Sequence, residues 1–455
     1  MPTWFHPDLL KASGTAFLIA LVLTPILRDI FRSYNIVDRP GQRKVHQYPI
    51  PRIGGIPIAV AYFAALWSLS SSNPALGVNF QKLLPGAAVV FLTGLVDDFV
   101  NLKPLVKLLG QIAAALIVFW SGIRIEGVAG QPLPLWLNLL LTVLWLLLST
   151  NALNLIDGLD GLCAGIGFVA TLTLVCAAVI HGDTGLANAT LPLAGALLGF
   201  ISYNLNPATV FLGDSGAMLI GFLLGCYGMI WTQKTATLLS LLVPLLALAV
   251  PLLDVSLAIL RRLLSKRSVF SADRAHIHHR LLDHGFTPRR AVLVLYVFAA
   301  VIAIIAVLLS SPLSRTYQNV IMVFILGIVL LGVRQLRYQE FQAAGQFLVG
   351  GEFQRRLRDK MRLDQLRTDL DRVGTAEEWW ETVGSFAKEQ GWVAIGWDGP
   401  RGVKKVQIVD REPDWTLSVP LAAAGTLTIQ GATGRDNLSP DVGAVARILR
   451  SSVHT

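Results

Sequence analysis

The chain has 455 residues, of which 53% are apolar and 15% are charged. An ordinary soluble domain carries about 25% charged residues, so this composition excludes a water-soluble globular protein over most of the length. The shortage is confined to residues 1–333, which hold 34 charged residues, whereas residues 334–455 hold 33. The formal net charge of +9 comes from basic residues in loops between apolar runs. That arrangement is typical of a membrane topology signal and excludes a nucleic-acid-binding face.

Apolar runs long enough to cross a bilayer recur through residues 1–333. A transmembrane helix needs about 20 mostly apolar residues. Eleven such runs are centred near Leu18, Ala61, Val90, Ala115, Leu144, Thr171, Ala196, Phe222, Leu246, Ile302 and Phe324. Pro244 and Pro251 fall inside one run and predict a kinked or broken helix there. We therefore expect an all-α polytopic membrane protein with about eleven transmembrane helices.

The basic residues of alternating loops predict the orientation of these spans. One set of loops, Arg28–Arg52, Lys103–Lys107 and Arg261–Arg290, holds 16 Lys and Arg residues, and the other set holds five. Loops rich in Lys and Arg stay in the cytoplasm. The N-terminus is then expected outside and the C-terminus inside.

Five polar segments interrupt the apolar pattern, and the predicted topology places all of them on the cytoplasmic side. They are Val37–Gly55, Asp97–Lys107, Asn151–Gly161, Asn204–Gly216 and His276–Arg280. A charge within a bilayer is costly, so a membrane domain with few charges is expected to place them for function. A single active site at one membrane surface would produce this distribution.

Asp97 and Asp98 form an acidic pair at the end of an apolar run. Adjacent carboxylates repel each other, so at a membrane boundary they need a nearby lysine or metal ion. Lys107, nine residues after Asp98 on the next predicted helix, is the candidate lysine. The alternative interpretation is the start of a solvated loop.

Polar residues at three-residue steps follow in Asn151, Asn154 and Asp157, with Asp160 close behind. On a helix such residues share one face. Carboxylate and carboxamide oxygens suit Mg²⁺, which completes its coordination with water and substrate phosphates. The glycines after Asp157 and Asp160 would let a nucleotide or phosphate approach the backbone closely. The alternative is a polar turn with glycine caps.

Two more motifs carry polar chemistry. Asp214 lies in a Gly-Asp-Ser-Gly motif between two apolar runs, where a turn does not require an acid. The segment His276–Arg280 contains three histidines and ends in arginine. It has no Cys or Glu partner at zinc-ligand spacing, and arginine suits phosphate oxygens, so phosphate binding is favoured over zinc. Asp254, a lone acid in an apolar run, is either structural or part of the site.

Taken in order, the motifs between Val37 and Arg290 resemble those of the polyprenyl-phosphate N-acetylhexosamine-1-phosphate transferase family, glycosyltransferase family 4. The His-Ile-His-His form at residues 276–279 is similar to the N-acetylglucosamine branch, whereas the pentapeptide branch usually has three adjacent histidines. The resemblance implies transfer of N-acetylglucosamine 1-phosphate, or a related N-acetylhexosamine 1-phosphate, from a UDP-sugar to undecaprenyl phosphate, with release of UMP. It implies Mg²⁺ as cofactor, with Mn²⁺ as a substitute. It also implies the inner (plasma) membrane and the first membrane step of cell-envelope polysaccharide synthesis.

The resemblance also implies roles for individual residues. Catalytic roles fall to Asp97, Asp98, Lys107 and Asp157. Metal binding falls to Asn154 and Asp214. Substrate contacts fall to Lys44, His46, Asp160, His276, His278, His279 and Arg280. Asn101 stands where the family pattern sometimes has a third acid, which weakens any assignment of metal binding to that position.

The charged C-terminal part is expected to form a small cytoplasmic α+β domain, so we place the domains at 1–335 and 336–455. Apolar residues at helical steps in Glu340–Arg372 (Phe353, Leu357, Met361, Leu366 and Leu370) indicate an amphipathic helix or a short coiled coil. Thr375 and Glu378 form a capping box that opens a second helix through Gln390. Strands are expected at Trp392–Trp397, Val403–Val409, Leu417–Pro420 and Thr426–Gln430, and a last helix near Asp441–Val453.

Two other functions compete with the transferase. A transporter would place polar groups near the middle of the membrane and would show repeat symmetry, but the polar residues here lie at span ends. A membrane anchor for the C-terminal domain would leave the acid-rich face without a purpose. The donor sugar, the role of the C-terminal domain, a homodimer and a covalent phospho-enzyme all stay open at this point.

Overall fold

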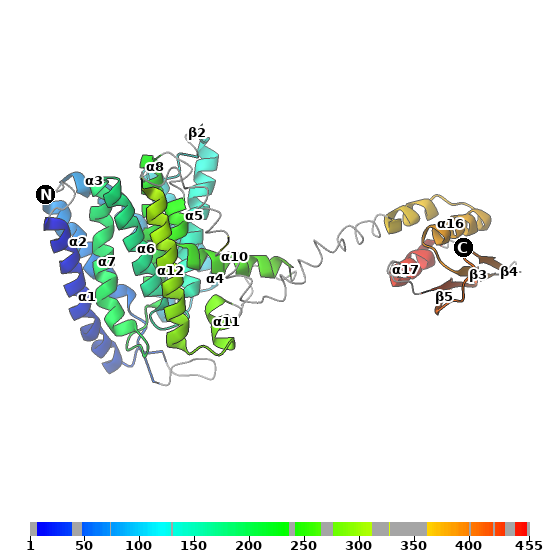
Figure 1. Cartoon of the computed structure of the whole chain (residues 1–455), viewed down its shortest axis with the longest axis horizontal. Coiled ribbons are helices and arrows are strands. Elements are labelled where there is room, and N and C mark those ends of the chain that lie inside the picture. The colour runs from blue at the N-terminus through cyan, green and yellow to red at the C-terminus, as the bar shows by residue number, and fades with distance from the viewer. Residues whose placement is uncertain are drawn as a thin grey trace. The chain divides into compact units, whose positions relative to one another are not determined.

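The computed structural model describes residues 7–38, 48–72, 74–128, 131–235, 242–264, 276–311, 327, 362–399, 402–421, 424–432 and 442–452. The chain divides into two compact units, Met1–Tyr338 and Gln339–Thr455 (Figure 1). The boundary expected between residues 335 and 336 lies outside the described residues.

The first unit is a bundle of helices. Its described helices are α1 (Pro7–Ser33), α2 (Gly55–Ser72), α3 (Pro74–Val100), α4 (Pro104–Trp120), α5 (Leu135–Ile156), α6 (Leu162–Ile180), α7 (Thr184–Asn204), α8 (Gly213–Thr235), α9 (Leu242–Ala247), α10 (Ala249–Leu264), α11 (Ile277–Asp283) and α12 (Pro288–Ser310). A two-stranded hairpin of β1 (Gly127–Val128) and β2 (Gln131–Pro132) precedes α5.

Seven of the described helices are long and apolar enough to cross a membrane, namely α1, α3, α5, α6, α7, α8 and α12. Helices α2 and α4 are apolar but shorter. Large apolar side chains such as Leu18, Leu144 and Ile304 lie exposed on the outside of the bundle, as a lipid environment allows. The unit is therefore a multi-pass membrane domain. The expected count of eleven spans stays a prediction, because the run around Phe324 lies outside the described residues.

The helix break predicted from Pro244 and Pro251 is confirmed. Helix α9 ends at Ala247, and α10 begins at Ala249. Pro251 has no N–H to donate to the carbonyl of Ala247, so a continuous helix would lose a hydrogen bond there. After the break α10 runs across the bundle instead of along it (Figure 1).

Helix α8 lies at the centre of the unit, with nearly all of its membrane-spanning part buried. Its first turn packs directly on α3 at Gly94. A Cβ atom at residue 94 would lie 2.6 Å from the Cα of Ser215 and 2.7 Å from the carbonyl oxygen of Asp214. Glycine is the residue that permits this approach, and it brings the ends of α3 and α8 together.

Short backbone bridges hold the first loop beside the start of α8. Asp38 pairs with Ile50, and Arg52 pairs with Phe211. The N–H of Gly54 donates to the carbonyl of Phe211 at 2.9 Å. These contacts place the residues before α2 next to the residues before α8, although the two segments are far apart in sequence.

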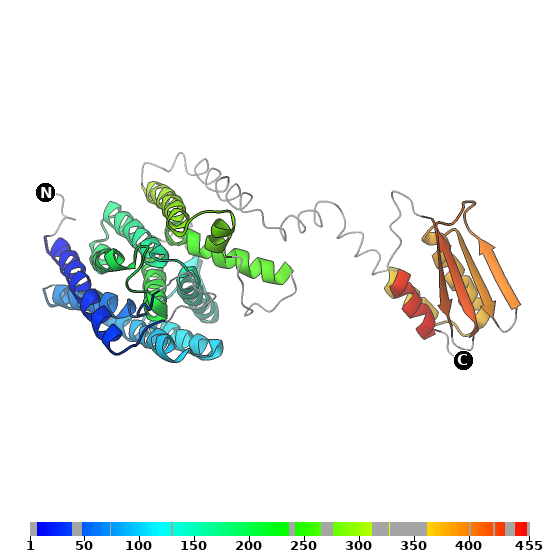
Figure 2. The same cartoon turned by 90° about the horizontal axis from the view of Figure 1, so that it is seen from below.

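The second unit is a four-stranded antiparallel sheet with helices on one side (Figure 2). Its elements are α16 (Ala376–Glu389), β3 (Ala394–Gly399), β4 (Gly402–Gln407), β5 (Trp415–Pro420), β6 (Thr426–Gly431) and α17 (Val442–Ser452), with strand order β4-β3-β6-β5. Alternate residues of β6, Leu427 and Ile429, are buried against the helices, as the two-residue period of a strand requires.

The structure confirms the elements expected in this second unit. All four strands and both helices form within a few residues of the expected bounds. The Oγ1 of Thr375 accepts a hydrogen bond from the N–H of Glu378 at 3.2 Å, which is the predicted cap of α16. Residues 362–370 are helical and bury Leu366 and Leu370. Phe353, Leu357 and Met361 lie outside the described residues.

Candidate active site

A cavity of about 730 Å³ opens at one end of the helix bundle. Its walls come from the end of α1, the loop before α2, the turn after α5, the segment from the end of α7 to the start of α8, and α11. The polar residues that line it are Arg32, Asp38, Tyr48, Arg52, Asp157, Asp160, Asn204, Asn206, Thr209, Asp214 and His279. Four of the five polar segments thus line this cavity, and the fifth, Asp97–Lys107, contacts Asp214 in its wall through Lys107.

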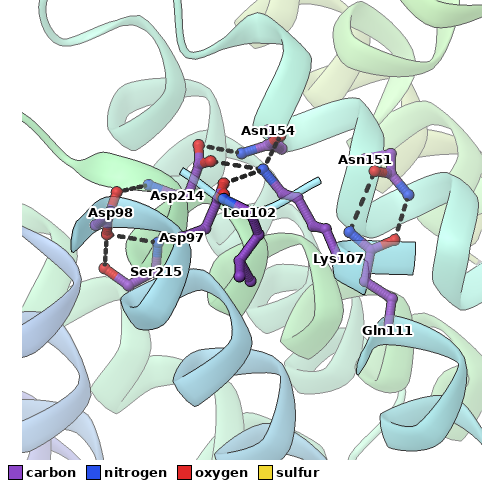
Figure 3. A network of polar contacts seen from close by, with 9 residues as sticks. All are labelled: Asp97, Asp98, Leu102, Lys107, Gln111, Asn151, Asn154, Asp214 and Ser215. Carbon is purple, nitrogen blue, oxygen red and sulfur yellow. Dashed lines mark hydrogen bonds and ion pairs between the residues drawn. The ribbon is translucent and has the colours of Figure 1, made fainter. Parts of the chain in front are cut away.

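Lys107 forms the centre of a polar network at the edge of this cavity (Figure 3). Its Nζ lies 2.9 Å from Oδ2 of Asp97, 2.5 Å from Oδ2 of Asp214 and 3.2 Å from Oδ1 of Asn154. The Nδ2 of Asn154 also donates to Asp214 at 2.8 Å. The network joins α3, α4, α5 and α8, and one ammonium forms ion pairs with two carboxylates. The ion pair expected between Lys107 and the acidic pair therefore forms, and its acidic partner is Asp97.

A tight turn between α3 and α4 completes the contacts of Asp97. Asn101 ends α3 in the left-handed conformation, with φ of 53°. Asn tolerates that conformation better than most residues do. The turn brings the N–H of Leu102 to Oδ1 of Asp97 at 2.6 Å, so both oxygens of this carboxylate have a donor.

Asp98 faces the first turn of α8 instead of Lys107. Its oxygens accept the N–H of Asp214 at 2.7 Å, the N–H of Ser215 at 3.0 Å and the hydroxyl of Ser215 at 2.6 Å (Figure 3). The first N–H groups of a helix lack partners within the helix, and a carboxylate is favoured there by the helix dipole. The two members of the acidic pair therefore have different surroundings.

A second polar pair lies one turn further into the bundle. Gln111 and Asn151 exchange hydrogen bonds of 2.7 and 3.2 Å between α4 and α5 (Figure 3). Gln111 follows Lys107 by four residues, and Asn151 precedes Asn154 by three. The pair fixes the register of the two helices that supply Lys107 and Asn154. Gln111 was missing from the candidates, although a buried amide one turn from Lys107 in an apolar run is a usable signal.

The turn after α5 places two more acids in the cavity wall. Asp157 is half-buried, and its desolvation, followed by the charges of Asp214 and Asp98, raises its pKa to about 8. Oδ2 of Asp160 accepts the side-chain N–H of Asn206 at 2.9 Å and the backbone N–H of Ala208 at 3.0 Å. Asp160 thus holds the segment after α7, which also lines the cavity.

Two histidines of α11, His278 and His279, lie at this turn and at the cavity, and His276 directly precedes the helix. The ring of His278 packs on Gly158, where a Cβ atom would lie 2.4 Å from Nε2 of the histidine. Burial and the neighbouring His279 lower the pKa of His278 to about 4, so this side chain is neutral near pH 7. His279 lines the cavity, and His276 begins the helix as its N-cap. Arg280 follows His279 on α11.

Comparison with known proteins agrees with this geometry. The sequence model of glycosyl transferase family 4 matches residues 80–232. A probable undecaprenyl-phosphate N-acetylglucosaminyl 1-phosphate transferase of Bacillus subtilis is 33% identical over 320 residues, which are 69% of this chain and 88% of the relative. The chain belongs to glycosyl transferase family 4. The resemblance inferred from the motifs is thereby confirmed.

Two further relatives fall in the same family. A decaprenyl-phosphate N-acetylglucosaminephosphotransferase of Mycobacterium tuberculosis is 35% identical, over 71% of this chain and 87% of the relative. An undecaprenyl-phosphate alpha-N-acetylglucosaminyl 1-phosphate transferase of Escherichia coli is 28% identical, over 70% and 88%. The family model covers α3 to α8 almost completely, which are the helices that carry the network around Lys107.

The structure brings together most of the residues expected in the site. Asp97, Asp98, Lys107, Asn154 and Asp214 share the network, while Asp157, Asp160 and His279 line the adjoining cavity. Lys44 and His46 lie outside the described residues. Their roles, like those of the other candidates, stay predictions.

Arg52 and Asn204 also line the cavity, although neither was a candidate. Arg52 pairs with Asp38 at 2.9 Å. Arg52 and Asn204 lie in two of the five polar segments identified from the sequence, but their residue types alone did not distinguish them from neighbouring polar residues.

The network has the donor atoms that a hard cation requires. Oδ2 of Asp97, Oδ1 of Asn154 and Oδ2 of Asp214 converge on one positively charged atom, Nζ of Lys107. Mg²⁺ binds through one or two carboxylates together with water and substrate phosphates, so this donor set fits it. Among the described residues, no group of three or more His, Cys, Asp and Glu side chains forms a metal site by itself. A bound ion would therefore depend on Asn154 and on the substrate as well.

Proposed function

We propose that this protein transfers N-acetylglucosamine 1-phosphate from UDP-N-acetylglucosamine to undecaprenyl phosphate and releases UMP. The observation that carries the proposal is the network around Lys107 beside a 730 Å³ cavity at the end of a membrane-spanning bundle. The family relatives named above act on polyprenyl phosphates and N-acetylglucosamine phosphate, according to their names. A soluble donor and a lipid acceptor can meet only at such a boundary.

The chemistry suits direct attack by the lipid phosphate. An oxygen of the acceptor phosphate forms a bond to the β-phosphorus of the donor, and the bond from that phosphorus to the bridging oxygen breaks. The bridging oxygen leaves with UMP, and the product is a lipid diphosphate sugar. Such transfers depend on positioning and charge neutralisation more than on covalent chemistry by the protein.

The residues of the network provide those two effects. Lys107 contributes a fixed positive charge where phosphate charge accumulates. Asp97, already held by Lys107 and Leu102, is placed to accept a proton from the acceptor phosphate or to orient it. Asp214 and Asn154 would hold Mg²⁺, which when bound neutralises diphosphate charge; Mn²⁺ offers similar ligand chemistry.

The cavity suits the nucleotide half of the donor. It presents guanidinium groups from Arg32 and Arg52, the amide of Asn204 and a neutral Asp157 in a concave site. The excess of basic loops supports a cytoplasmic position for this end of the bundle, with the N-terminus outside and the C-terminal unit inside. A UDP-sugar made in the cytoplasm would then enter directly.

The test is release of UMP by the purified full-length protein in detergent. We expect release that requires both undecaprenyl phosphate and UDP-N-acetylglucosamine, stops with EDTA and returns with Mg²⁺. Asp97→Asn and Asp214→Asn should nearly abolish release while the protein stays monodisperse. Asp29→Asn, an exposed acid paired with Arg28 on α1, is the matched control and should keep full activity.

Other UDP-sugars in the same assay identify the donor. Equal rates with UDP-N-acetylgalactosamine would widen the proposed specificity to N-acetylhexosamines. No UMP release with any donor and acceptor pair would reject the proposed reaction and return transport or anchoring as explanations.

A further inference from the structure

Asp254 on α10 is a buried acid that the reaction above does not use. Only 2% of its surface is exposed. Its Oδ2 lies 2.9 Å from Nδ1 of His276, and its Oδ1 accepts the N–H of Ile277 at 2.7 Å. Both oxygens therefore point at the first two residues of the segment that forms α11, 22 and 23 residues later in the chain.

These contacts replace the usual cap of a helix. The N-cap residue of α11 is His276, and its side chain accepts no hydrogen bond from the helix. The free N–H of Ile277 is satisfied instead by Asp254 from α10. The start of α11 is thus fixed to the helix that crosses the bundle after the break at Leu248.

Side-chain contacts along α11 connect its anchored first residues to the cavity. The rings of His276 and His278 stack with centroids 5.8 Å apart, and those of His278 and His279 lie 4.3 Å apart. His278 is 2% exposed and rests on Gly158 in the turn that carries Asp157, while His279 lines the cavity. The close fit at Gly158 leaves little room for α11 to shift without moving His279.

We propose that Asp254 is a positioning residue that determines where α11 presents His279 to the sugar-nucleotide donor. Asp254 acts through His276 and the helix and does not touch the substrate. The inference rests on the proposed function, because it assigns the cavity to the UDP-sugar. The proposal predicts that changes at Asp254 alter the KM for the UDP-sugar donor and leave the KM for the lipid acceptor unchanged.

The test compares Asp254→Ala and Asp254→Asn with wild type in the UMP-release assay. Asp254→Ala removes both contacts and should raise the KM for UDP-N-acetylglucosamine about tenfold or more, with the KM for undecaprenyl phosphate unchanged. Asp254→Asn keeps an oxygen for the N–H of Ile277, so its effect should be smaller. If Asp254→Ala fails to fold, Asp254→Asn decides by the same split between the two KM values.

Asp183 provides a matched control. It is also an acid that caps a helix, since its side chain accepts the N–H of Leu186 at 3.1 Å. It lies at the opposite end of α7 from Asn204, which lines the cavity. Asp183→Ala should leave both KM values unchanged.

A double variant tests the route through His276. In Asp254→Asn/His276→Gln the donor KM should rise no further than in the more severe single variant, because both changes break one connection. Additive increases of the donor KM in the double variant would contradict the inference. An equal loss of kcat and of both affinities, in proportion to a lower melting temperature, would also contradict it. If wild type released no UMP, the proposed function would fail, and binding of UDP-N-acetylglucosamine measured by calorimetry would still compare Asp254→Asn with wild type.

Discussion

Lys107 shows how one residue can let acids persist at a membrane boundary. Two carboxylates within reach of each other repel strongly where water is scarce. The lysine ammonium contacts both Asp97 and Asp214, and the carboxamide of Asn154 fills a third side. The same charge would then be available to a phosphate that enters the network.

Replacing Lys107 tests that dual role. Lys107→Met keeps the length and apolar stem of the side chain but removes the charge. We expect the rate of UMP release to fall about 100-fold or more, because a preorganised charge at the reacting phosphate is lost. Lys103→Met, at the exposed N-cap of the same helix, is the control. Near-normal turnover of Lys107→Met would remove the lysine from the mechanism.

Asp157 has a proton at neutral pH, because burial raises its pKa to about 8. It therefore suits a hydrogen-bond donor to a substrate oxygen better than a general base. The raised pKa also has a consequence for folding. Below the pKa of the unfolded state, near 4, the preference of the native state for protonated Asp157 contributes fully to the free energy of unfolding. This contribution is lost as the pH rises through the native-state pKa of about 8.

The pH dependence of donor binding follows from the same group. As the pH rises through about 8, Asp157 becomes a carboxylate that repels the diphosphate, so the KM of wild type for the UDP-sugar should increase. Asp157→Asn, which stays neutral, should lack this increase. KM values measured from pH 6.5 to 9.5 for both proteins check the expectation, and identical profiles would contradict it.

At the scale of helices, the site depends on how closely α3 and α8 approach. Asp98 can cap α8 only because no side chain separates the helices at Gly94. A β-carbon there would overlap backbone atoms of residues 214 and 215, which cannot move aside as a flexible side chain can.

Gly94→Ala should therefore destabilise the protein by about 1–3 kcal/mol, the usual cost of overpacking, and should reduce activity. Gly14→Ala is the matched control, because a Cβ atom there meets nothing within 4 Å. That change should be neutral or stabilising by up to about 1 kcal/mol, since alanine favours helix more than glycine does. Melting temperatures in detergent and UMP release would show whether the two glycines differ in this way.

The elements were largely predictable because their signals are local. Ten of the eleven apolar runs fall on described helices, and the prolines predicted the break between α9 and α10. The capping box at Thr375 predicted the start of α16. Each of these signals lies within a few residues of its effect.

The contacts of the site were not predictable in the same way. Spacing placed Asn154 and Asp157 near each other, but it could not show that Asp97 and Asp98 turn to different partners. That difference depends on the packing of α8, more than 100 residues later. The role of Asp254 was left open for the same reason, since its partners lie on another helix.

At the scale of the whole chain, the candidate active site lies in only one of the two units. Every residue that lines the cavity lies between Arg32 and Pro288, within the first unit. The second unit has its own buried core, which includes Trp392, Ile395 and Leu427. The reaction should therefore need only the first unit.

Deleting residues 339–455 tests this independence. We expect kcat and both KM values to stay at the full-length level in the detergent assay, because no described cavity residue is removed. A large fall in kcat, with the shortened protein still monodisperse, would show that the second unit contributes to turnover.

The bonds from Asp98 to α8 also bear on how the protein is made. Asp97 and Lys107 are ten residues apart and can pair as soon as α4 has left the ribosome and entered the bilayer. The partners of Asp98 are 116 and 117 residues further on in the chain. This acid therefore lacks these hydrogen-bond donors until four more helices and the start of α8 have been synthesised. Insertion of α8 is thus the step of biogenesis at which Asp98 acquires its hydrogen-bond donors.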